Sequence, residues 1–363
     1  MRFLTAALCT TVAAALLAAC SSNGSSPSSA MPGGSGVTSM AHHGLIPQMA
    51  IPKNLLRPAR YHLTKLAASY TRGIATATFG SLEETSTNYI FTKNNSANGP
   101  PVCTSTDSTY GVNNVQSDSA GDLIVPDAFA GVAVYAPPFT SSSCGTLLGT
   151  ISDLYGQAAD AASNNAATGT IVVGHAAGEV AVCTLASLTC SELNSNLDSF
   201  TQVAIDKAGN CYADGDDAST GLVVLDVYTG CTGNPVVATG FSESYLGGIA
   251  VDNKGNLTAI ALLNSGFSTP STVTTYSGCA TGACRLVSGP TNLTGESIYG
   301  GIGRQNQRYV TADLSTDEME VYSYKSGTGV GSMMYDFNNG LSGCTTSLIS
   351  FCEAATFLPS GVK

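Results

Sequence analysis

The sequence contains no tryptophan, only four histidines and few charged side chains. Charged residues make up 11% of the 363 positions, against about 25% in an average soluble domain. So few charges, in a chain rich in Gly, Ser and Thr, argue against a helical bundle or a coiled coil, whose surfaces carry many acid–base pairs. The hydrophobic share of 43% is nevertheless large enough for a folded core, so the chain as a whole is not disordered.

Acidic residues are missing from the first 82 positions. Residues 1–72 carry six basic side chains and no acidic one, a formal charge of +6. Residues 73–363 carry eight basic and 25 acidic side chains, a formal charge of −17. The chain therefore has two electrostatically different parts, and the acidic body argues against nucleic acid as a partner.

The N-terminus has the pattern of a secretory signal, a positive start followed by a short apolar stretch and small residues. Arg2 precedes the apolar residues 3–19, which end Leu17-Ala18-Ala19-Cys20. This ending resembles the lipobox of bacterial lipoproteins. The resemblance implies cleavage before Cys20, a diacylglyceryl group on the Cys20 sulfur and an acylated new amino group. An ordinary cleaved signal with a chance cysteine is the alternative.

Composition divides the chain into four segments. We expect a lipoprotein signal peptide at 1–19, a low-complexity, flexible tether at 20–41, a basic, proline-broken arm at 42–72 and the folded body at 73–363. The arm is interpreted either as a segment that lies on anionic head groups or on the acidic body, or as a solvated spacer. Ser21 after the cysteine resembles lipoproteins sent onward to the outer membrane in bacteria with two membranes.

Three segments of the body share one pattern: an apolar strand, Asp, two residues, Gly, Asn or Asp, and a second strand. They are NNVQSDSAGDLIVPD (113–127), TQVAIDKAGNCYAD (201–214) and GGIAVDNKGNLTAI (247–260). The pattern predicts tight hairpins in which Asp accepts backbone N–H bonds and Gly has a positive φ. Gly121, Gly209 and Gly255 are 88 and 46 residues apart. This spacing predicts degenerate copies at 168–185, 300–324 and 347–361.

Repeats of about 40–50 residues with several short strands are typical of a β-propeller. Counting one unit near each of residues 121, 168, 209, 255, 306 and 355 predicts an all-β propeller with six blades. The last unit stops after what would be its first two strands. We therefore expect the strand-like segments 85–95 and 100–108 to complete that blade, so that the two ends of the chain close the ring and leave no exposed sheet edge.

The absence of tryptophan argues against WD40 blades. The segments VAIDKAGNCYADG, GIAVDNKGNLTAI and RYVTADLSTDEMEVYSY resemble NHL repeats instead. The resemblance covers about residues 85–363 and implies a fold, not an activity. A pair of β-sandwiches or a β-helix is the alternative architecture.

Ten cysteines remain when Cys9 in the signal and Cys20 are set aside. An even number in an exported chain predicts disulfides, and the absence of a Cys-x-x-Cys pair argues against zinc. Spacing predicts bridges within blades at Cys183–Cys190, Cys211–Cys231, Cys279–Cys284 and Cys344–Cys352. Cys103–Cys144 is then left by elimination.

Four polar residues fall at the same point of four repeats, the turn after the second strand. They are Asp127, His175, Asp214 and Asp313. Repetition around a ring would bring them near one another, as a site for Ca²⁺ or a cationic ligand. The alternative is that each is a turn residue bonded to its own backbone. No other cofactor is predicted, and the Asp214-Gly215-Asp216-Asp217 cluster has the same two interpretations.

These features predict a membrane-anchored exported lipoprotein whose propeller is a binding or scaffolding module at the cell envelope. Its ligand would be an envelope protein, a glycan or a small molecule, met at the channel mouth and at loops such as 140–144 and 265–271. The alternative is a metal-dependent hydrolase or lyase of the lactonase-like propeller type. It is less favoured because Glu179 and Glu296 are isolated and no Gly-x-Ser-x-Gly elbow, phosphate loop or dinucleotide fingerprint is present.

Overall fold

The computed structural model describes the repeat region, and its secondary structure there consists of strands β1 to β24 and two short 3₁₀ turns. The described residues are 71–79, 87–92, 100–106, 114–127, 131–152, 158–199, 201–243, 247–261, 270–303, 308–313, 318–338, 341 and 351–362. The predicted signal peptide, the tether with Cys20 and residues 42–70 of the predicted arm lie outside them. Among the described residues no helix is long and apolar enough to cross a membrane.

The strands form one eight-stranded sheet and four four-stranded sheets. The eight-stranded sheet has the order β3-β2-β1-β24-β6-β5-β4, with β7 paired to β6. Its strands are β1 (Thr71–Phe79), β2 (Thr87–Thr92), β3 (Cys103–Thr106), β4 (Gln116–Ser117), β5 (Leu123–Asp127), β6 (Gly131–Thr140), β7 (Ser143–Ile151) and β24 (Phe351–Val362).

The four-stranded sheets follow one another along the chain. The first two contain β8 (Ala158–Ser163), β9 (Thr170–His175), β10 (Val180–Thr184), β11 (Thr189–Leu193), β12 (Gln202–Ile205), β13 (Cys211–Asp216), β14 (Val223–Tyr228) and β15 (Val236–Val237). The last two contain β16 (Ile249–Val251), β17 (Leu257–Ala261), β18 (Thr272–Ser277), β19 (Arg285–Asn292), β20 (Gly300–Ile302), β21 (Arg308–Asp313), β22 (Glu318–Lys325) and β23 (Gly329–Phe337).

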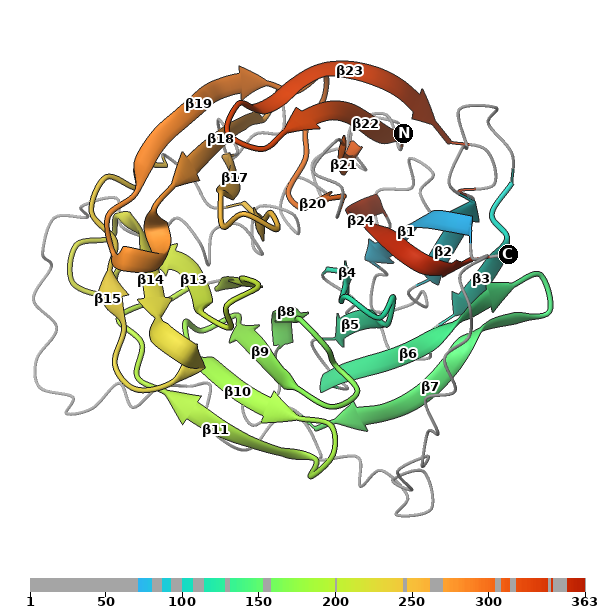
Figure 1. The fold of residues 1–363 in the computed structure, drawn as a ribbon, viewed down its shortest axis with the longest axis horizontal. Coiled ribbons are helices and arrows are strands. Elements are labelled where there is room, and N and C mark those ends of the chain that lie inside the picture. Colours follow the sequence, from blue (N-terminus) through green and yellow to red (C-terminus); the bar gives the residue numbers. More distant parts are fainter. Residues whose placement is uncertain are drawn as a thin grey trace, which may run out of the picture. The chain divides into compact units, whose positions relative to one another are not determined.

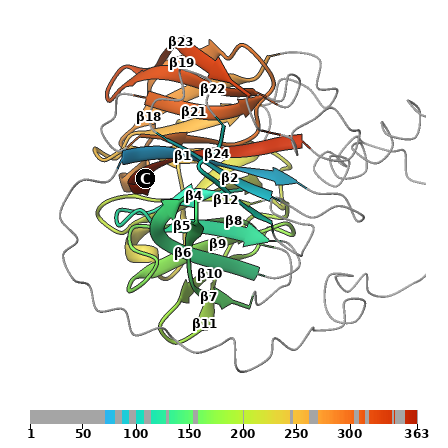
Figure 2. The same cartoon turned by 90° about the vertical axis from the view of Figure 1, so that its right-hand side faces the viewer.

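The sheets are arranged radially around a centre (Figure 1). Strands β4, β8, β12, β16, β20 and β24 contact one another in that order, and β24 contacts β4 again. The last strand of each four-stranded sheet lies at the periphery, and the view from the side places β19 and β23 at one rim and β7 and β11 at the opposite rim (Figure 2). Pro58–Lys363 forms one compact unit, and this radial arrangement confirms the predicted all-β propeller.

The eight-stranded sheet consists of two groups of four strands, β4 to β7 and β24-β1-β2-β3. A single parallel residue pair, Val362 with Phe139, links the two groups. The buried side chains of Ile90 and Leu358 from one group pack against Leu123 of the other in a shared apolar cluster. The two groups therefore stack face to face, as neighbouring four-stranded sheets do.

Closure of the ring by both ends of the chain is confirmed, because β24 pairs antiparallel with β1. The predicted division of strands is wrong: the C-terminus contributes one strand and the N-terminal part contributes three. Residues 351–362 contain no Asp-Gly or Asn-Gly turn, so they form one 12-residue strand instead of two short ones. β1 was not predicted, because its Thr–Ala alternation is only weakly hydrophobic.

The Asp-x-x-Gly hairpins have the predicted turn chemistry. Asp252 Oδ1 accepts the backbone N–H groups of Lys254 at 2.8 Å and Asn256 at 2.9 Å, and Gly255 has a φ of +81°. The same carboxylate also reaches the next sheet, because the Tyr324 hydroxyl donates to its Oδ2 at 3.0 Å. Each such aspartate therefore forms its own turn, and Asp252 in addition fastens that turn to a neighbour.

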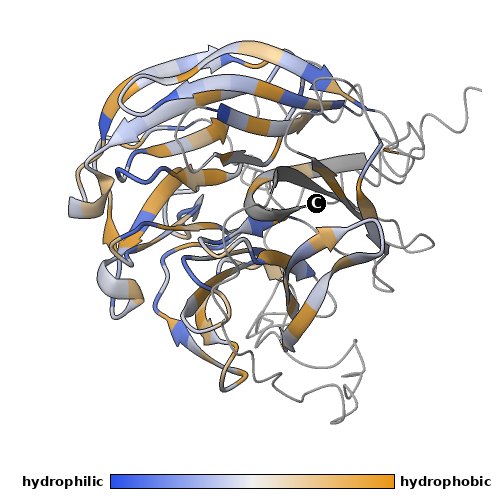
Figure 3. Cartoon of the chain, turned by 45° about the vertical axis from the view of Figure 1, so that its right-hand side comes forward, coloured by the Kyte–Doolittle hydropathy of each residue, from blue (hydrophilic) through white to orange (hydrophobic). Residues whose placement is uncertain are grey.

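The apolar core lies between neighbouring sheets. Apolar residues are spread along the strands (Figure 3), and every residue of strands such as β5, β8 and β17 is buried. Both faces of a sheet therefore pack against the sheets beside it. Val172 of β9, Val203 of β12 and Ala213 of β13, for example, are fully buried in one cluster.

Four of the five predicted disulfides are present, Cys103–Cys144, Cys183–Cys190, Cys211–Cys231 and Cys279–Cys284. Cys344 of the fifth predicted bridge, Cys344–Cys352, lies outside the described residues. Cys183–Cys190 joins paired positions of β10 and β11 within one sheet. Cys103–Cys144 instead joins β3 to β7, and so links the two four-strand groups of the eight-stranded sheet.

Candidate functional site

The four predicted site residues lie at corresponding places in their sheets. Asp127, His175 and Asp313 are the last residues of β5, β9 and β21, and Asp214 is two residues before the end of β13. Each is at most 2% exposed. Second strands run in the same direction in every sheet of a propeller, so their ends lie at one face of the ring. Binding of one ligand by all four residues stays a prediction.

Two of the four have backbone partners in other segments of the chain. Asp313 Oδ1 accepts the backbone N–H of Glu296 at 3.1 Å, which holds the connection between β19 and β20 in place. The carbonyl of His175 accepts the backbone N–H of Thr201 at 3.1 Å, and its own N–H donates to Glu179. These contacts connect neighbouring sheets at the face where the second strands end.

Asp214 has a different environment. It is paired in register with Gln202 of β12, so the two side chains lie on the same face of the sheet. Burial raises the pKa of Asp214 well above its usual value, and the negative charges of Asp160 and Glu243 raise it further. Its Oδ1 atom has no hydrogen-bond partner among the residues that the structure describes.

Asp160 lies on β8, one of the strands at the centre of the ring, and is fully buried. Its carboxylate accepts N–H groups from Asn114 at 2.7 Å, Gln116 at 3.0 Å and the backbone of Val203 at 2.9 Å. Burial outweighs these hydrogen bonds and raises the pKa of Asp160 to about 7. This buried carboxyl group on β8 is bonded to residues at β4 and to β12, and so joins the inner strands of neighbouring sheets.

Gln202 extends the polar network across the ring. Its Nε2 donates to the Tyr299 hydroxyl at 3.1 Å, beyond the sheet of β16. Gly248 lies directly before β16, and a Cβ there would be 2.9 Å from Tyr299 Cδ1. The missing side chain therefore lets Tyr299 pack close enough to meet Gln202. The Gln202 Oε1 atom has no partner within the described part of the chain.

The sequence predicted Asp214 but missed Asp160, Gln202 and Tyr299. A signal for Asp160 exists in hindsight: it is a lone acidic residue in the strand AADAAS, and a carboxyl group inside a strand of small residues must find hydrogen-bond donors elsewhere. Gln202 has no comparable signal. Its relevance depends on the glycine at position 248 and the tyrosine at 299, which no local pattern connects.

In the acidic cluster that follows Asp214, the last residue, Asp217, forms a turn. Its Oδ1 accepts the backbone N–H groups of Ser219 at 3.0 Å and Thr220 at 2.8 Å. Hydrogen bonds from the side chains of Ser219 and Thr220 lower the pKa of Asp217. The described residues include no group of three or more His, Cys, Asp and Glu side chains placed to hold a metal ion.

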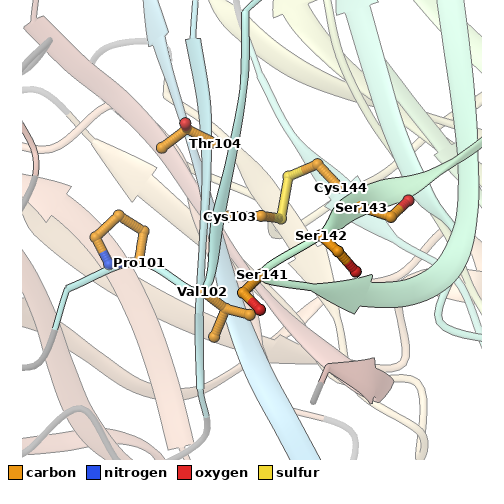
Figure 4. A pocket seen from close by; sticks show the side chains of 8 residues that line it. All are labelled: Pro101, Val102, Cys103, Thr104, Ser141, Ser142, Ser143 and Cys144. Atoms are coloured by element: carbon orange, nitrogen blue, oxygen red, sulfur yellow. A yellow bond between two sulfur atoms is a disulfide. The ribbon is translucent and has the colours of Figure 1, made fainter.

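A groove lies at the C-terminal end of β6. Asp127 lies at the opposite end of this strand, where it pairs with Gly131. The lining of the groove consists of Pro101–Thr104 and Ser141–Cys144, on either side of the Cys103–Cys144 disulfide (Figure 4). The groove has a volume of about 380 Å³, and hydroxyl groups of serine and threonine dominate its wall. The predicted recognition loop 140–144 thus borders a surface depression, while most of the loop 265–271 lies outside the described residues.

No protein-family profile matches the chain, and no curated protein matches it. Solved structures share its fold at low sequence identity. The structure titled as a nidogen/laminin complex is 10% identical, with a TM-score of 0.53, over 79% of this chain and 98% of that chain. TolB from Acinetobacter baumannii is 13% identical, with a TM-score of 0.51, over 83% of this chain and 69% of that chain. These similarities support the β-propeller fold.

Proposed function

We propose that the protein is an exported, lipid-anchored lipoprotein whose six-bladed propeller is a binding or scaffolding module at the cell envelope. The observation that carries the proposal is a leader ending Leu17-Ala18-Ala19-Cys20 in front of a disulfide-bonded propeller. Disulfides persist in oxidising compartments outside the cytosol, and the four bridges support such a location.

Six blades follow from counting the eight-stranded sheet as two. Its two groups of four strands share only the Val362–Phe139 pair and stack through buried side chains. Together with the four four-stranded sheets they supply the six inner strands that contact one another around the ring. The three NHL-like segments, which lie in three different sheets, are compatible with the same count.

A binding role suits a rigid ring with polar groups gathered at one face of its centre. Loops and channel mouths of a propeller present side chains from several sheets to one ligand. One structural neighbour of this propeller comes from a nidogen/laminin complex. It illustrates a protein-binding role in that neighbour. A partner at the envelope, a protein, a glycan or a small ligand, is what we propose for this chain.

Anchoring is tested by replacing the lipidated cysteine. We expect Cys20→Ala to move the protein from the membrane fraction to the soluble fraction, since each buried acyl methylene contributes about 0.8 kcal/mol to membrane binding. Cys9→Ala is the matched control, because Cys9 precedes the cleavage site and should leave anchoring unchanged. Fractionation followed by immunoblotting measures both. Retention of Cys20→Ala on membranes would contradict a lipid anchor at this residue.

A screen for enzymatic turnover distinguishes the proposed binding role from the enzyme alternative. We expect the purified full-length protein to show no turnover in a broad screen of esters, lactones and glycosides. Turnover that disappears in Asp214→Ala would contradict the binding-module proposal and support the enzyme alternative. Because the screen does not depend on Cys20, its result and the anchoring result stand separately.

A further inference from the structure

We propose that Asp214 and Gln202 bind a primary ammonium group of a small organic cation, next to the buried Asp160 carboxyl group. The inference rests on the proposed binding function and names a ligand class for it. The observation that carries it is a pair of buried acceptor oxygens on neighbouring strands, facing the same side of one sheet, for which the described part of the chain provides no hydrogen-bond donor.

The two acceptors are Asp214 Oδ1 and Gln202 Oε1, and each residue is 2% exposed. Neither atom has a hydrogen-bond partner among the described residues. A buried acceptor without a donor costs about 1–3 kcal/mol, and native structures contain few of them. Two on directly paired positions indicate a place where a ligand supplies the donors.

The side chains of Asp214 and Gln202 lie close together. Residues opposite each other in antiparallel strands have Cβ atoms about 4.5–5.5 Å apart, and Gln202 is opposite Asp214. The Tyr299 hydroxyl binds Gln202 Nε2 at 3.1 Å, which orients the amide and leaves Oε1 as its open end. Asp160 is held next to the same strand, because the N–H of Val203, the residue after Gln202, donates to its Oδ2.

The charge of the surroundings favours a cation. The charged groups that act on Asp214 are Asp160 on β8, Glu243 before β16 and Asp216 on β13, and all are acidic. Burial and these negative charges raise the pKa of Asp214. A cationic ligand acts in the opposite direction and lowers that pKa, so binding favours loss of a proton from the carboxyl group.

The number of open oxygens favours an ammonium group over a hard metal ion. Both oxygens of Asp160 already accept N–H groups, which leaves the two acceptors of Asp214 and Gln202. Calcium takes six to eight oxygen ligands, whereas an ammonium group has three N–H donors. Asp216, two residues beyond Asp214, is partly exposed, so the site lies just beneath the surface of that face.

The test is a calorimetric titration of the purified full-length protein with propylammonium, tetramethylammonium and calcium chloride. We expect binding of propylammonium, and no binding of tetramethylammonium, which has the charge but no N–H donor. Titrations in buffers of different ionisation enthalpy should report proton release on binding, assigned to Asp214 with Asp160, Glu243 and Asp216 as its titratable neighbours.

Variants locate the site. Asp214→Asn should weaken propylammonium binding about tenfold or more, because it removes a charge-assisted hydrogen bond, and it should abolish the proton release. Gln202→Leu is the second variant and should weaken binding while leaving the proton release in place. Asp217→Asn, on the exposed turn nearby, is the matched control and should bind as the wild type does. Thermal melting checks that each variant is folded.

Three results would overturn the proposal: no binding of propylammonium by the folded wild type, binding that Asp214→Asn leaves unchanged, or Asp214-dependent binding of calcium in its place. None of these results changes the membrane fractionation of Cys20→Ala. Failure of the ammonium site is therefore distinguishable from failure of the proposed function.

Discussion

Several carboxyl groups of this charge-poor protein are buried where water cannot stabilise their charge. Burial raises the pKa values of Asp122 and Glu320 to about 7, as it does for Asp160. The turn residue Asp252 differs, since hydrogen bonds from Asn256 and Lys254 outweigh its burial and lower its pKa. The protein thus has two classes of aspartate, those that stabilise turns when charged and those that are most stable in the ring when neutral.

These two classes predict a stability maximum in mildly acidic solution. A carboxyl group with a pKa of about 7 when folded and about 4 when unfolded binds more protons in the folded state between these values, so stability falls as pH rises through that window. The loss is at most about 1.4 kcal/mol per pH unit for each such group. Asp252 acts in the opposite sense, because its contribution is present above its unfolded pKa and is lost as pH falls below about 4.

Melting temperatures measured from pH 4.5 to 8 check this expectation. The wild type should melt at a lower temperature at pH 8 than at pH 5. Asp160→Asn should have a shallower pH dependence, while Asp217→Asn, whose native pKa is lowered, should have the wild-type slope. A melting temperature that stays level or rises from pH 5 to pH 8 would contradict the raised pKa values of the buried carboxyl groups.

At the scale of elements, turns were predictable and strand partnerships were not. Asp-x-x-Gly fixes a hairpin through local hydrogen bonds, so Asp252 and Gly255 could be recognised from six residues of sequence. β1 and β24 are partners almost 300 positions apart, and no local pattern assigns them to each other. The same reason explains why Asp214 was predicted and Asp160 was not. Asp214 is part of a repeat, whereas the hydrogen-bond donors of Asp160 come from Asn114, Gln116 and Val203, which are distant in the sequence.

Gly248 tests how closely neighbouring inner strands must approach. In Gly248→Ala the added methyl group would lie 2.9 Å from Tyr299 Cδ1 and 3.1 Å from its Cα, so Tyr299 must shift away from position 248. Overpacking of this kind costs about 1–3 kcal/mol. The control is Gly303→Ala, where nothing lies nearer than 3.4 Å and the change should be within about 1 kcal/mol of neutral. Urea unfolding measures both, and equal stabilities would contradict the close approach.

At the scale of the whole molecule, one disulfide differs from the others in what it connects. Cys103–Cys144 spans 41 residues and joins the two four-strand groups at which the ring closes. Cys183–Cys190 spans seven residues within one hairpin. The chain-entropy estimate assigns about 4 kcal/mol to the long loop and about 2.5 kcal/mol to the short one.

We therefore expect the double variant Cys103→Ser, Cys144→Ser to lose more stability than the double variant Cys183→Ser, Cys190→Ser. Urea unfolding of both proteins under non-reducing conditions compares them, and replacing both cysteines avoids free thiols. A larger loss from the hairpin bridge would show that closure of the ring does not depend on the Cys103–Cys144 link.

The pairing of β1 with β24 also has a consequence for biosynthesis. β1 to β3 are made early, beginning at Thr71, but the strand that completes their group, β24, begins only at Phe351. Until β24 has been made, β1 keeps an unpaired edge, and the ring cannot close. The final step of folding is thus postponed until β24 is available, and any product that ends before Phe351 keeps an exposed edge that invites aggregation.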